Sequence, residues 1–304
     1  MEFSPLFWPI RLKGSTIYIL DETKLPQRLT YIKAKNYQEA CKAIKEMKTR
    51  AVGQVLLVMY TFLLSKRQNK NLNKVAQAIN ATRPTLAFKV LTDLVLGWEN
   101  SRAPLEKNIL GFLEMLKAKR IQQARNTAKL LKNRDVILTH CNVSGLMPLI
   151  AEFARKAGKK ISFYVTETRP YLQGSRLTAW EIMRAKFPVT IITDNMVAYL
   201  LSQGKVTKII VGADHLTQNG DIANKIGTYQ IAVVAKYFKI PFYVLCPPSS
   251  KLKSGKDIKI EIRPENELKI YQGLYLAPKE VKAYYPAFDV TPVKLITKHI
   301  YLEV

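Results

Sequence analysis

The second half of the chain alternates short apolar runs with polar turns and amphipathic stretches, and this alternation restricts the possible fold more than any other feature. The runs are rich in β-branched residues and occupy positions 136–139, 161–165, 189–193, 208–211 and 241–245. Such alternation is typical of a parallel sheet covered by helices. We therefore predict an α/β fold class for this half.

A different pattern fills roughly the first 125 residues. Residues 10–12 and 16–20 predict a short ribbon, with Lys13-Gly14-Ser15 as its turn. Beyond the ribbon, apolar positions at spacings of three and four predict helices over residues 37–49, 53–65, 71–80, 85–98 and 104–132. The sequence thus predicts a mainly helical domain over residues 1–125, followed by an α/β domain over residues 126–304.

The formal net charge is +25, from 48 Lys and Arg against 23 Asp and Glu. A surplus of cations attracts anions such as nucleic acid, acidic lipid or phosphorylated metabolites. Here the basic residues occur in small groups, such as Lys66-Arg67 and Lys159-Lys160, between apolar residues. We interpret them as solvated helix faces, and we do not expect nucleic-acid binding.

Membrane insertion and disulfide bonding are not expected either. No apolar run reaches the roughly 18 residues that span a bilayer, and the N-terminus lacks the basic and apolar parts of a signal peptide. The three cysteines lie far apart and are too few for a disulfide framework or a zinc site of four thiolates. These features predict a cytoplasmic protein with reduced thiols and without a zinc site of four thiolates.

Polar residues follow the first and fourth apolar runs, where ligands bind in open parallel sheets. Cys141 lies where the N-terminus of a following helix would lower the pKa of its thiol, although it could equally be a buried structural cysteine. Asp214 is a candidate acid or base, because partial burial would raise the pKa of its carboxyl group, with Lys225 as a tuning charge. An N-cap for the next helix is the alternative interpretation of Asp214.

The connection after the second run is dense in polar and cationic groups. Arg169 and Arg176 carry planar guanidinium groups suited to phosphate, and Gln173 can hydrogen-bond a sugar hydroxyl. Alternatively, the two arginines pair with Glu167 and Glu181 and only fix the loop. The sequence leaves both interpretations of the arginines open.

Taken together, these segments resemble the methylthioribose-1-phosphate isomerases, a family shared with ribose-1,5-bisphosphate isomerases and the regulatory subunits of initiation factor 2B. The resemblance runs nearly end to end, and from residue 166 to 229 it is closer to the methylthioribose branch. The matching segments are Leu25-Pro26, Arg83-Pro84-Thr85, Thr-His-Cys-Asn at 139–142, Glu-Thr-Arg-Pro at 167–170, Thr-Asp-Asn-Met at 193–196, Val-Gly-Ala-Asp at 211–214, residues 219–229, and Pro-Ala-Phe-Asp-Val-Thr-Pro at 286–292.

The resemblance implies a reaction, a fold and a set of site residues. The reaction is the conversion of 5-methylthioribose 1-phosphate to 5-methylthioribulose 1-phosphate, an aldose–ketose isomerisation of methionine salvage. The fold is a helical N-terminal domain followed by a Rossmann-like domain, in a homodimer without metal or nucleotide cofactor. The implied catalytic residues are Cys141 and Asp214, and the implied substrate-binding residues are Arg50, Ala51, Val52, Arg83, Gln173, Asn224 and Lys225.

Departures from the family pattern, two of which follow, keep other activities open. The family's Arg-Gly-Ala phosphate-binding turn reads Arg50-Ala51-Val52 here, so a glycine that lets the backbone approach phosphate has gained a methyl group. The stretch 143–148 is shorter than in the methylthioribose branch. The alternatives are an isomerase of ribose 1,5-bisphosphate or 5-deoxyribose 1-phosphate, and a non-catalytic regulator that resembles the initiation-factor subunits.

Overall fold

The computed structural model describes residues 3–83, 88–101 and 104–302. Pro84 and Thr85, which belong to one of the matching segments, lie outside the described residues. The chain divides into two compact units, residues 1–120 and residues 121–304. Each unit has its own architecture and its own group of predicted site residues.

The first unit opens with a three-stranded antiparallel sheet, ordered β1-β2-β3. Its strands are β1 (Ile10–Lys13), β2 (Thr16–Leu20) and β3 (Tyr31–Ala34). The turn between β1 and β2 contains Gly14 at φ 56°, a conformation that glycine adopts without steric cost. The predicted ribbon is therefore confirmed, and β3 extends it.

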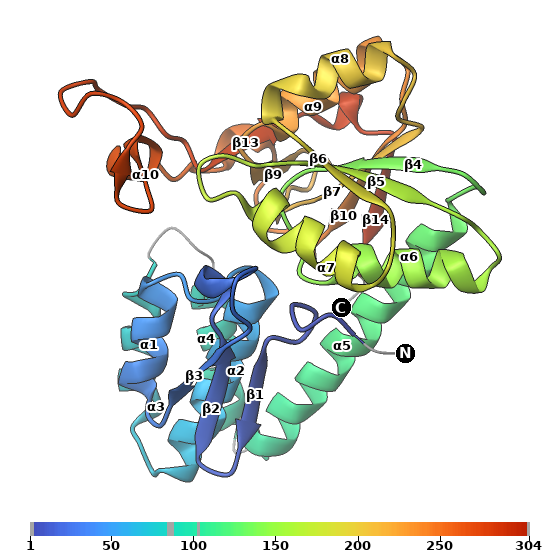
Figure 1. Cartoon of the computed structure of the whole chain (residues 1–304). Coiled ribbons are helices and arrows are strands. Elements are labelled where there is room, and N and C mark those ends of the chain that lie inside the picture. Colours follow the sequence, from blue (N-terminus) through green and yellow to red (C-terminus); the bar gives the residue numbers. More distant parts are fainter. Residues whose placement is uncertain (1–2, 84–87, 102–103, 303–304) are drawn as a thin grey trace. The chain divides into compact units, whose positions relative to one another are not determined.

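Helices make up most of the rest of the first unit, and the central one is buried on almost every side. They are α1 (Tyr37–Lys45), α2 (Val52–Arg67), α3 (Leu72–Asn80), α4 (Phe88–Asn100) and α5 (Leu105–Lys129), of which α5 continues into the second unit. The segment of α2 is apolar all round, and α1, α3, α4 and the sheet pack against it (Figure 1). The helices predicted for this region are confirmed where the structure describes them.

The second unit is built on a six-stranded, fully parallel sheet ordered β14-β10-β7-β4-β5-β6. Its strands are β4 (Val136–Thr139), β5 (Ser162–Thr166), β6 (Val189–Ile192), β7 (Lys208–Gly212), β10 (Phe242–Cys246) and β14 (Lys298–Tyr301). From β4 the chain adds β5 and β6 on one side, and then β7, β10 and β14 on the other. This order confirms the predicted α/β class and puts the topological switch point between β4 and β7.

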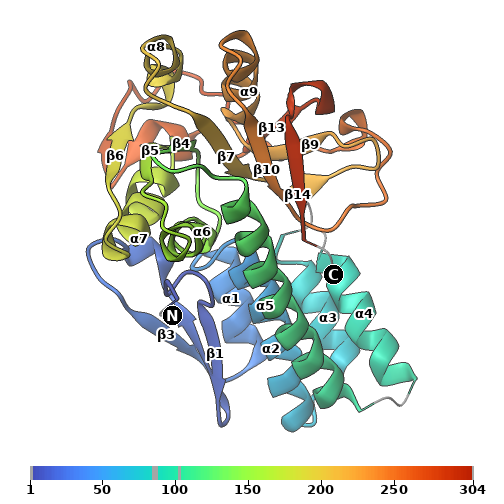
Figure 2. The ribbon, with the colours of Figure 1, turned by 90° about the vertical axis from the view of Figure 1, so that its right-hand side faces the viewer.

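Helices cover both faces of this sheet (Figures 1 and 2). One face carries α6 (Leu146–Lys156) and α7 (Ala179–Arg184), and the other carries α8 (Val197–Ser202) and α9 (Thr228–Tyr237). Between the sheet and the second pair lies a core that includes Ile209, Val211 and Val244. None of the described helices combines the length and the apolar character that a membrane span requires.

A second, smaller sheet completes the site region. It is antiparallel, with the order β13-β9-β8, and consists of β8 (His215–Leu216), β9 (Ile222–Lys225) and β13 (Phe288–Thr291). The connection from β10 to β13 carries a short helix and hairpin, α10 (Asn266–Lys269), β11 (Ile270–Tyr271) and β12 (Leu274–Tyr275). The sequence patterns do not predict this sheet, because β9 is half polar and β8 has two residues.

Candidate active site

The two predicted catalytic residues follow neighbouring strands at the topological switch point. Cys141 lies two residues beyond β4, and Asp214 lies two residues beyond β7. The loops that carry them touch, because a Cβ atom built on Gly212 would come within 2.7 Å of Val143 Cγ1. In open α/β sheets, the crevice at such a point is where ligands bind.

Cys141 is held in a conformation that costs a non-glycine residue free energy. Its φ is 63°, in the left-handed region. Its backbone N–H donates to Thr168 Oγ1 at 2.9 Å, and its carbonyl oxygen accepts from Thr178 Oγ1 at 2.5 Å. The side chain is a half-buried thiol that forms no disulfide. Strain that the surroundings enforce at an accessible thiol is typical of functional positions.

Asn142 and Glu181 fix the loop after Cys141. Asn142 Nδ2 donates to Glu181 Oε1 and to Thr178 Oγ1, both at 2.9 Å, and Asn142 Oδ1 accepts from the N–H of Ser144 at 2.8 Å. Glu181 is buried on α7. The amide of Asn142 therefore joins the β4–α6 loop to the first turn of α7.

His140 braces the other side of Cys141, a role that sequence reasoning missed. Its Nε2 lies 2.9 Å from the carbonyl oxygen of Ile226, and its Nδ1 lies 2.6 Å from Thr166 Oγ1. Since a carbonyl only accepts, Nε2 carries the proton and Nδ1 accepts from the hydroxyl of Thr166. Burial lowers the pKa of His140, so the imidazole is a neutral brace. In the sequence, only its position beside Cys141 could have indicated this role of His140.

Asp214 begins the β8–β9 hairpin. Its backbone N–H donates to the carbonyl oxygen of Ala223 at 2.9 Å, and its side chain is exposed. The partial burial expected from the sequence is therefore absent in this structure. The alternative role as a helix N-cap is also wrong, because a strand follows rather than a helix.

Asn224 and Lys225 are buried at the end of β9. Asn224 Nδ2 donates to Thr228 Oγ1 at 2.9 Å. Lys225 Nζ lies 4.8 Å from the ring centroid of Phe288 and 5.7 Å from that of Tyr171, so two aromatic rings hold its ammonium group in place. Its positive charge adds to the burial that lowers the pKa of His140.

Gln173 presents an unused hydrogen-bond acceptor. It precedes the π-helical turn η2 (Gly174–Thr178) and is only 4% exposed. Within the described part of the chain, its buried Oε1 atom has no hydrogen-bond partner. The turn packs so tightly that a Cβ atom on Gly174 would lie 1.7 Å from the carbonyl oxygen of Thr166. A sugar hydroxyl is a donor that would satisfy Gln173.

The neighbouring arginines of this connection bind backbone oxygens. Arg169 donates from its guanidinium group to the carbonyl oxygen of Leu268 at 2.9 Å, and its backbone N–H donates to Asp194 Oδ2 at 2.7 Å. Arg176 donates to the carbonyl oxygen of Tyr171 at 3.2 Å. These contacts favour the loop-fixing interpretation, and Arg169 also interacts electrostatically with Glu167.

The remaining predicted residues, Arg50, Ala51, Val52 and Arg83, belong to the first unit and gather at the N-terminus of α2. Arg50 Nη1 lies 3.7 Å from Glu22 Oε2, and Arg83 Nη1 donates to Gln54 Oε1 at 3.3 Å. Ala51 is the N-cap residue and has φ 44°. A helix N-terminus flanked by two guanidinium groups attracts an anion such as phosphate.

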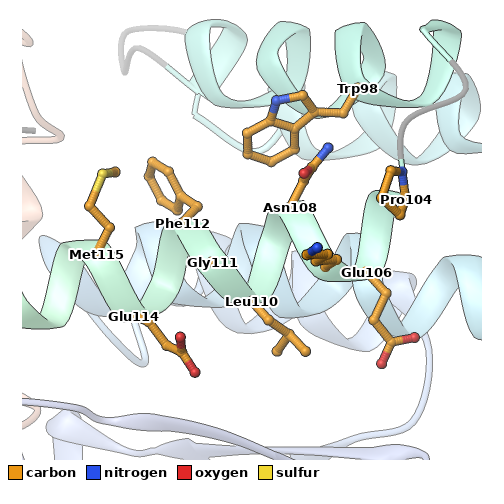
Figure 3. Close-up of a pocket in the computed structure, with 10 residues that line it drawn as sticks. Trp98, Pro104, Glu106, Asn108, Leu110, Gly111, Phe112, Glu114 and Met115 are labelled. Atoms are coloured by element: carbon orange, nitrogen blue, oxygen red, sulfur yellow. The ribbon is translucent and has the colours of Figure 1, made fainter.

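A groove between α4 and α5 contains none of the predicted site residues (Figure 3). Trp98 and Phe112 meet edge to face in it, with their ring centroids 6.3 Å apart. Its charged lining residues are Glu106, Glu114 and Lys107, so carboxylates outnumber the ammonium group and disfavour a sugar phosphate. Elsewhere, no cluster of three or more His, Cys, Asp or Glu suited to a metal ion occurs among the described residues.

Comparison with known proteins gives both enzymes and translation factors. The model of the Initiation factor 2 subunit family matches residues 38–301. Methylthioribose-1-phosphate isomerase of Fervidobacterium nodosum is 37% identical over 93% of this chain and 90% of its own length. The crystal structure of 5-methylthioribose 1-phosphate isomerase from Pyrococcus horikoshii is 31% identical with a TM-score of 0.83, covering 99% of this chain and 94% of that one. The structure of translation initiation factor eIF-2B, subunit delta, from A. fulgidus is 33% identical with a TM-score of 0.82, covering 97% and 94%. The fold is common to both kinds of protein, so the side chains of the site must distinguish them.

Proposed function

The chain belongs to the initiation factor 2 subunit family, and we propose that within it this protein is an aldose–ketose isomerase, which converts 5-methylthioribose 1-phosphate to 5-methylthioribulose 1-phosphate in methionine salvage. The observation that carries the proposal is Cys141, a strained and accessible thiol after β4, with Asp214 after the neighbouring strand β7. A regulator that only binds other proteins needs neither group. The name of the 37% identical relative supports the same reaction.

The chemistry requires a proton donor and a group that moves a proton at C2. A phosphate on the anomeric oxygen prevents spontaneous ring opening, so the bond between C1 and the ring oxygen must be cleaved with assistance. Asp214, whose residue is exposed and so accessible to the sugar, protonates the ring oxygen. Cys141, as a thiolate, then takes the proton from C2 to give an enol and returns a proton to C1. The carboxylate of Asp214 takes the proton of the C2 hydroxyl, so the ketone forms and both groups return to their starting states.

A hydride shift from C2 to C1 is the competing route, and it gives Cys141 a smaller part. The two routes differ in where the new hydrogen at C1 originates. Turnover in deuterium oxide incorporates deuterium at C1 if Cys141 transfers a proton that exchanges with solvent. Complete retention of the substrate hydrogen favours the hydride shift.

Phosphate recognition is assigned to Arg50 and Arg83, with the backbone N–H groups of Ala51 and Val52 at the start of α2. Sugar recognition is assigned to Gln173, Asn224 and Lys225. The unused Oε1 acceptor of Gln173 suits a sugar hydroxyl, and the buried ammonium group of Lys225 suits an oxygen that carries partial negative charge.

A side-by-side assay tests the proposed function. We expect methylthioribose 1-phosphate, and also 5-deoxyribose 1-phosphate, to be converted with kcat/KM at least about tenfold above ribose 1,5-bisphosphate, or about 1.4 kcal/mol. The reason is that two of the segments that depart from the family, 50–53 and 143–148, supply mainly apolar side chains and no new cation. Preference for the bisphosphate would contradict this choice of substrate. No turnover of any of the three would favour the regulatory alternative.

We also propose that the protein is a cytoplasmic homodimer. Tyr229, Val233 and Tyr237 recur at every fourth residue of α9 and are exposed, and Tyr199 on the adjacent α8 is exposed as well (Figure 2). Exposed apolar groups gathered on one face favour burial against a partner, and a second copy of the chain offers the same stripe. The three cysteines form no disulfide, which fits a reducing compartment.

A further inference from the structure

The hydroxyl of Tyr285 is a buried hydrogen-bonding group that no assigned role uses. Tyr285 is 3% exposed, and its hydroxyl has no hydrogen-bond partner within residues 3–83, 88–101 and 104–302. Buried tyrosine hydroxyls are normally paired, because removal from water without a partner costs free energy. An unused phenol inside a protein therefore suggests a ligand atom that satisfies it.

The position of this side chain is fixed from two directions. The carbonyl oxygen of Tyr285 accepts from the backbone N–H of Arg263 at 2.9 Å. Its ring meets the ring of Tyr171 edge to face, with centroids 6.2 Å apart. The hydroxyl of Tyr171 in turn donates to Glu267 and accepts from Arg263 Nη2 at 3.1 Å. Tyr171 is thus occupied with structural contacts, whereas the hydroxyl of Tyr285 is available.

Tyr285 belongs to the wall of the proposed site. The ring of Tyr171 lies 5.7 Å from Lys225 Nζ, and Phe288, three residues after Tyr285, lies 4.8 Å from the same atom. Burial raises the pKa of the phenol, and electrostatic interactions with Tyr171, Glu267 and Cys141 raise it further. Cys141 therefore interacts electrostatically with the hydroxyl of Tyr285, but this hydroxyl makes no hydrogen bond to the sulfur. Two such groups can contact the same bound ligand.

We propose that Tyr285 is a further catalytic residue, whose hydroxyl donates a hydrogen bond to the C2 oxygen of the bound sugar phosphate. This inference rests on the proposed isomerase function. Cys141 takes the proton from C2 to give an enol, and partial negative charge develops on the C2 oxygen when its hydroxyl proton passes to the carboxylate of Asp214 and C1 is protonated. A fixed donor in a buried site stabilises that charge, and the proton remains on the phenol oxygen throughout.

The chemistry of a phenol suits this role better than that of a carboxyl group. The raised pKa of Tyr285 keeps the hydroxyl protonated across the pH range of an assay, so it is always a donor. Asp214, in contrast, must release and regain its proton in each cycle. The two groups therefore have different roles: Asp214 gives its proton to the ring oxygen and regains one from the C2 hydroxyl, whereas Tyr285 only donates a hydrogen bond to the C2 oxygen.

Replacement of Tyr285 by phenylalanine tests the inference, because it removes the donor and keeps the ring. For Tyr285→Phe we expect kcat to fall about 10²–10³-fold, the usual effect of losing one such donor, with KM within about threefold of the wild type. The matched control is Tyr284→Phe, at a position that is 75% exposed, which should leave both constants unchanged. A kcat for Tyr285→Phe within about twofold of the wild type would overturn the inference.

A second variant separates donation from packing. Site-specific incorporation of trifluorotyrosine at 285 keeps the shape of the side chain and lowers the pKa of the phenol. The variant should acquire an alkaline limb in its kcat profile, where the ionised phenol no longer donates. A pH profile identical to that of the wild type would overturn the inference, even if Tyr285→Phe is unstable. Wild-type protein that converts none of the three sugar phosphates would instead refute the proposed function itself.

Discussion

Two residues of the proposed site, Cys141 and Ala51, have backbone conformations that carry a cost for any residue with a Cβ atom. Their φ angles are 63° and 44°. At Cys141 the strained conformation belongs to the residue whose thiol the proposed chemistry needs, so the strain accompanies a functional side chain. At Ala51 the methyl group is exposed and packs in no core, so no burial of this group offsets the strain.

Cys141 provides the most direct test at the residue scale. We expect Cys141→Ser to lower kcat by about 10²–10⁴-fold, because a serine hydroxyl is a far weaker proton carrier than a thiol. Cys141→Gly should be equally inactive, yet its melting temperature should be equal to or above that of the wild type, since glycine adopts a positive φ without strain. Calorimetry and steady-state kinetics measure both effects. Near-normal turnover in either variant would contradict the role of Cys141.

Ala51 allows the opposite experiment, a substitution that should improve the protein. Ala51→Gly restores the residue that the positive φ favours, so the free energy of unfolding should rise by about 1 kcal/mol and KM should fall, because the backbone can approach the phosphate more closely. The matched control is Ala81→Gly at φ −72°, which should lower the free energy of unfolding by about 0.5–1 kcal/mol. Urea unfolding compares the two, and equal losses in both variants would contradict the strain argument.

At the scale of elements, the sequence predicts those strands whose own residues show a clear apolar pattern. The sequence predicts β4, β5, β6, β7 and β10 within one residue of their observed ends, because each is a short β-rich apolar run between polar turns. It does not predict β14, in which only Ile300 is buried, or the sheet that contains β9. Local patterns also do not predict the order of the strands in the sheet, because the pairing of β14 with β10 joins segments that are distant in the sequence.

The same distinction explains which site residues the sequence could identify. Cys141 and Asp214 follow strands, so the rule for ligand binding at strand ends finds them directly. His140 and Tyr285 depend on contacts with residues far along the chain, with Ile226 and Tyr171 respectively. No spacing or composition encodes such contacts, and only the folded structure shows them.

The N-terminus of α9 predicts a pH dependence of stability. Asp289 on β13 accepts hydrogen bonds from the backbone N–H groups of Gly227 and Tyr229, and burial raises the pKa of its carboxyl group from 3.8 to about 6. The folded state then binds more protons than the unfolded state between these values. The contribution of Asp289 to the free energy of unfolding is therefore fully present below about pH 4. It is lost as the pH rises through about 6.

The variant Asp289→Asn isolates this effect, because the amide oxygen can still accept while the charge is gone. Between pH 4 and pH 7, the wild type should lose about 1–3 kcal/mol of unfolding free energy relative to the variant. Groups with the opposite behaviour, such as buried His140, are common to both proteins and cancel in the difference. Denaturant titrations across this range measure it, and parallel curves for the two proteins would refute the assignment.

At the scale of the whole molecule, charge and apolar surface oppose each other in self-association. Each chain carries a formal net charge of +25, so two copies repel. The stripe of Tyr229, Val233 and Tyr237 on α9 offers apolar contact that favours association. Salt screens the repulsion and leaves the apolar contact largely intact, so ionic strength separates the two contributions.

We therefore expect a homodimer that becomes tighter as salt is added. Between low and moderate ionic strength, the dissociation constant should fall by about tenfold, which corresponds to about 1.4 kcal/mol. Tyr237→Lys, at a position that is 80% exposed, should shift the protein to monomers, because it adds a charge and removes apolar area from the stripe. Val90→Lys adds the same charge on α4, at a position that is 67% exposed, and should leave the dimer intact. Sedimentation equilibrium measures all three proteins. A Tyr237→Lys variant that associates like the wild type would move the interface away from α9, and wild-type protein that stays monomeric at both salt concentrations would refute the homodimer.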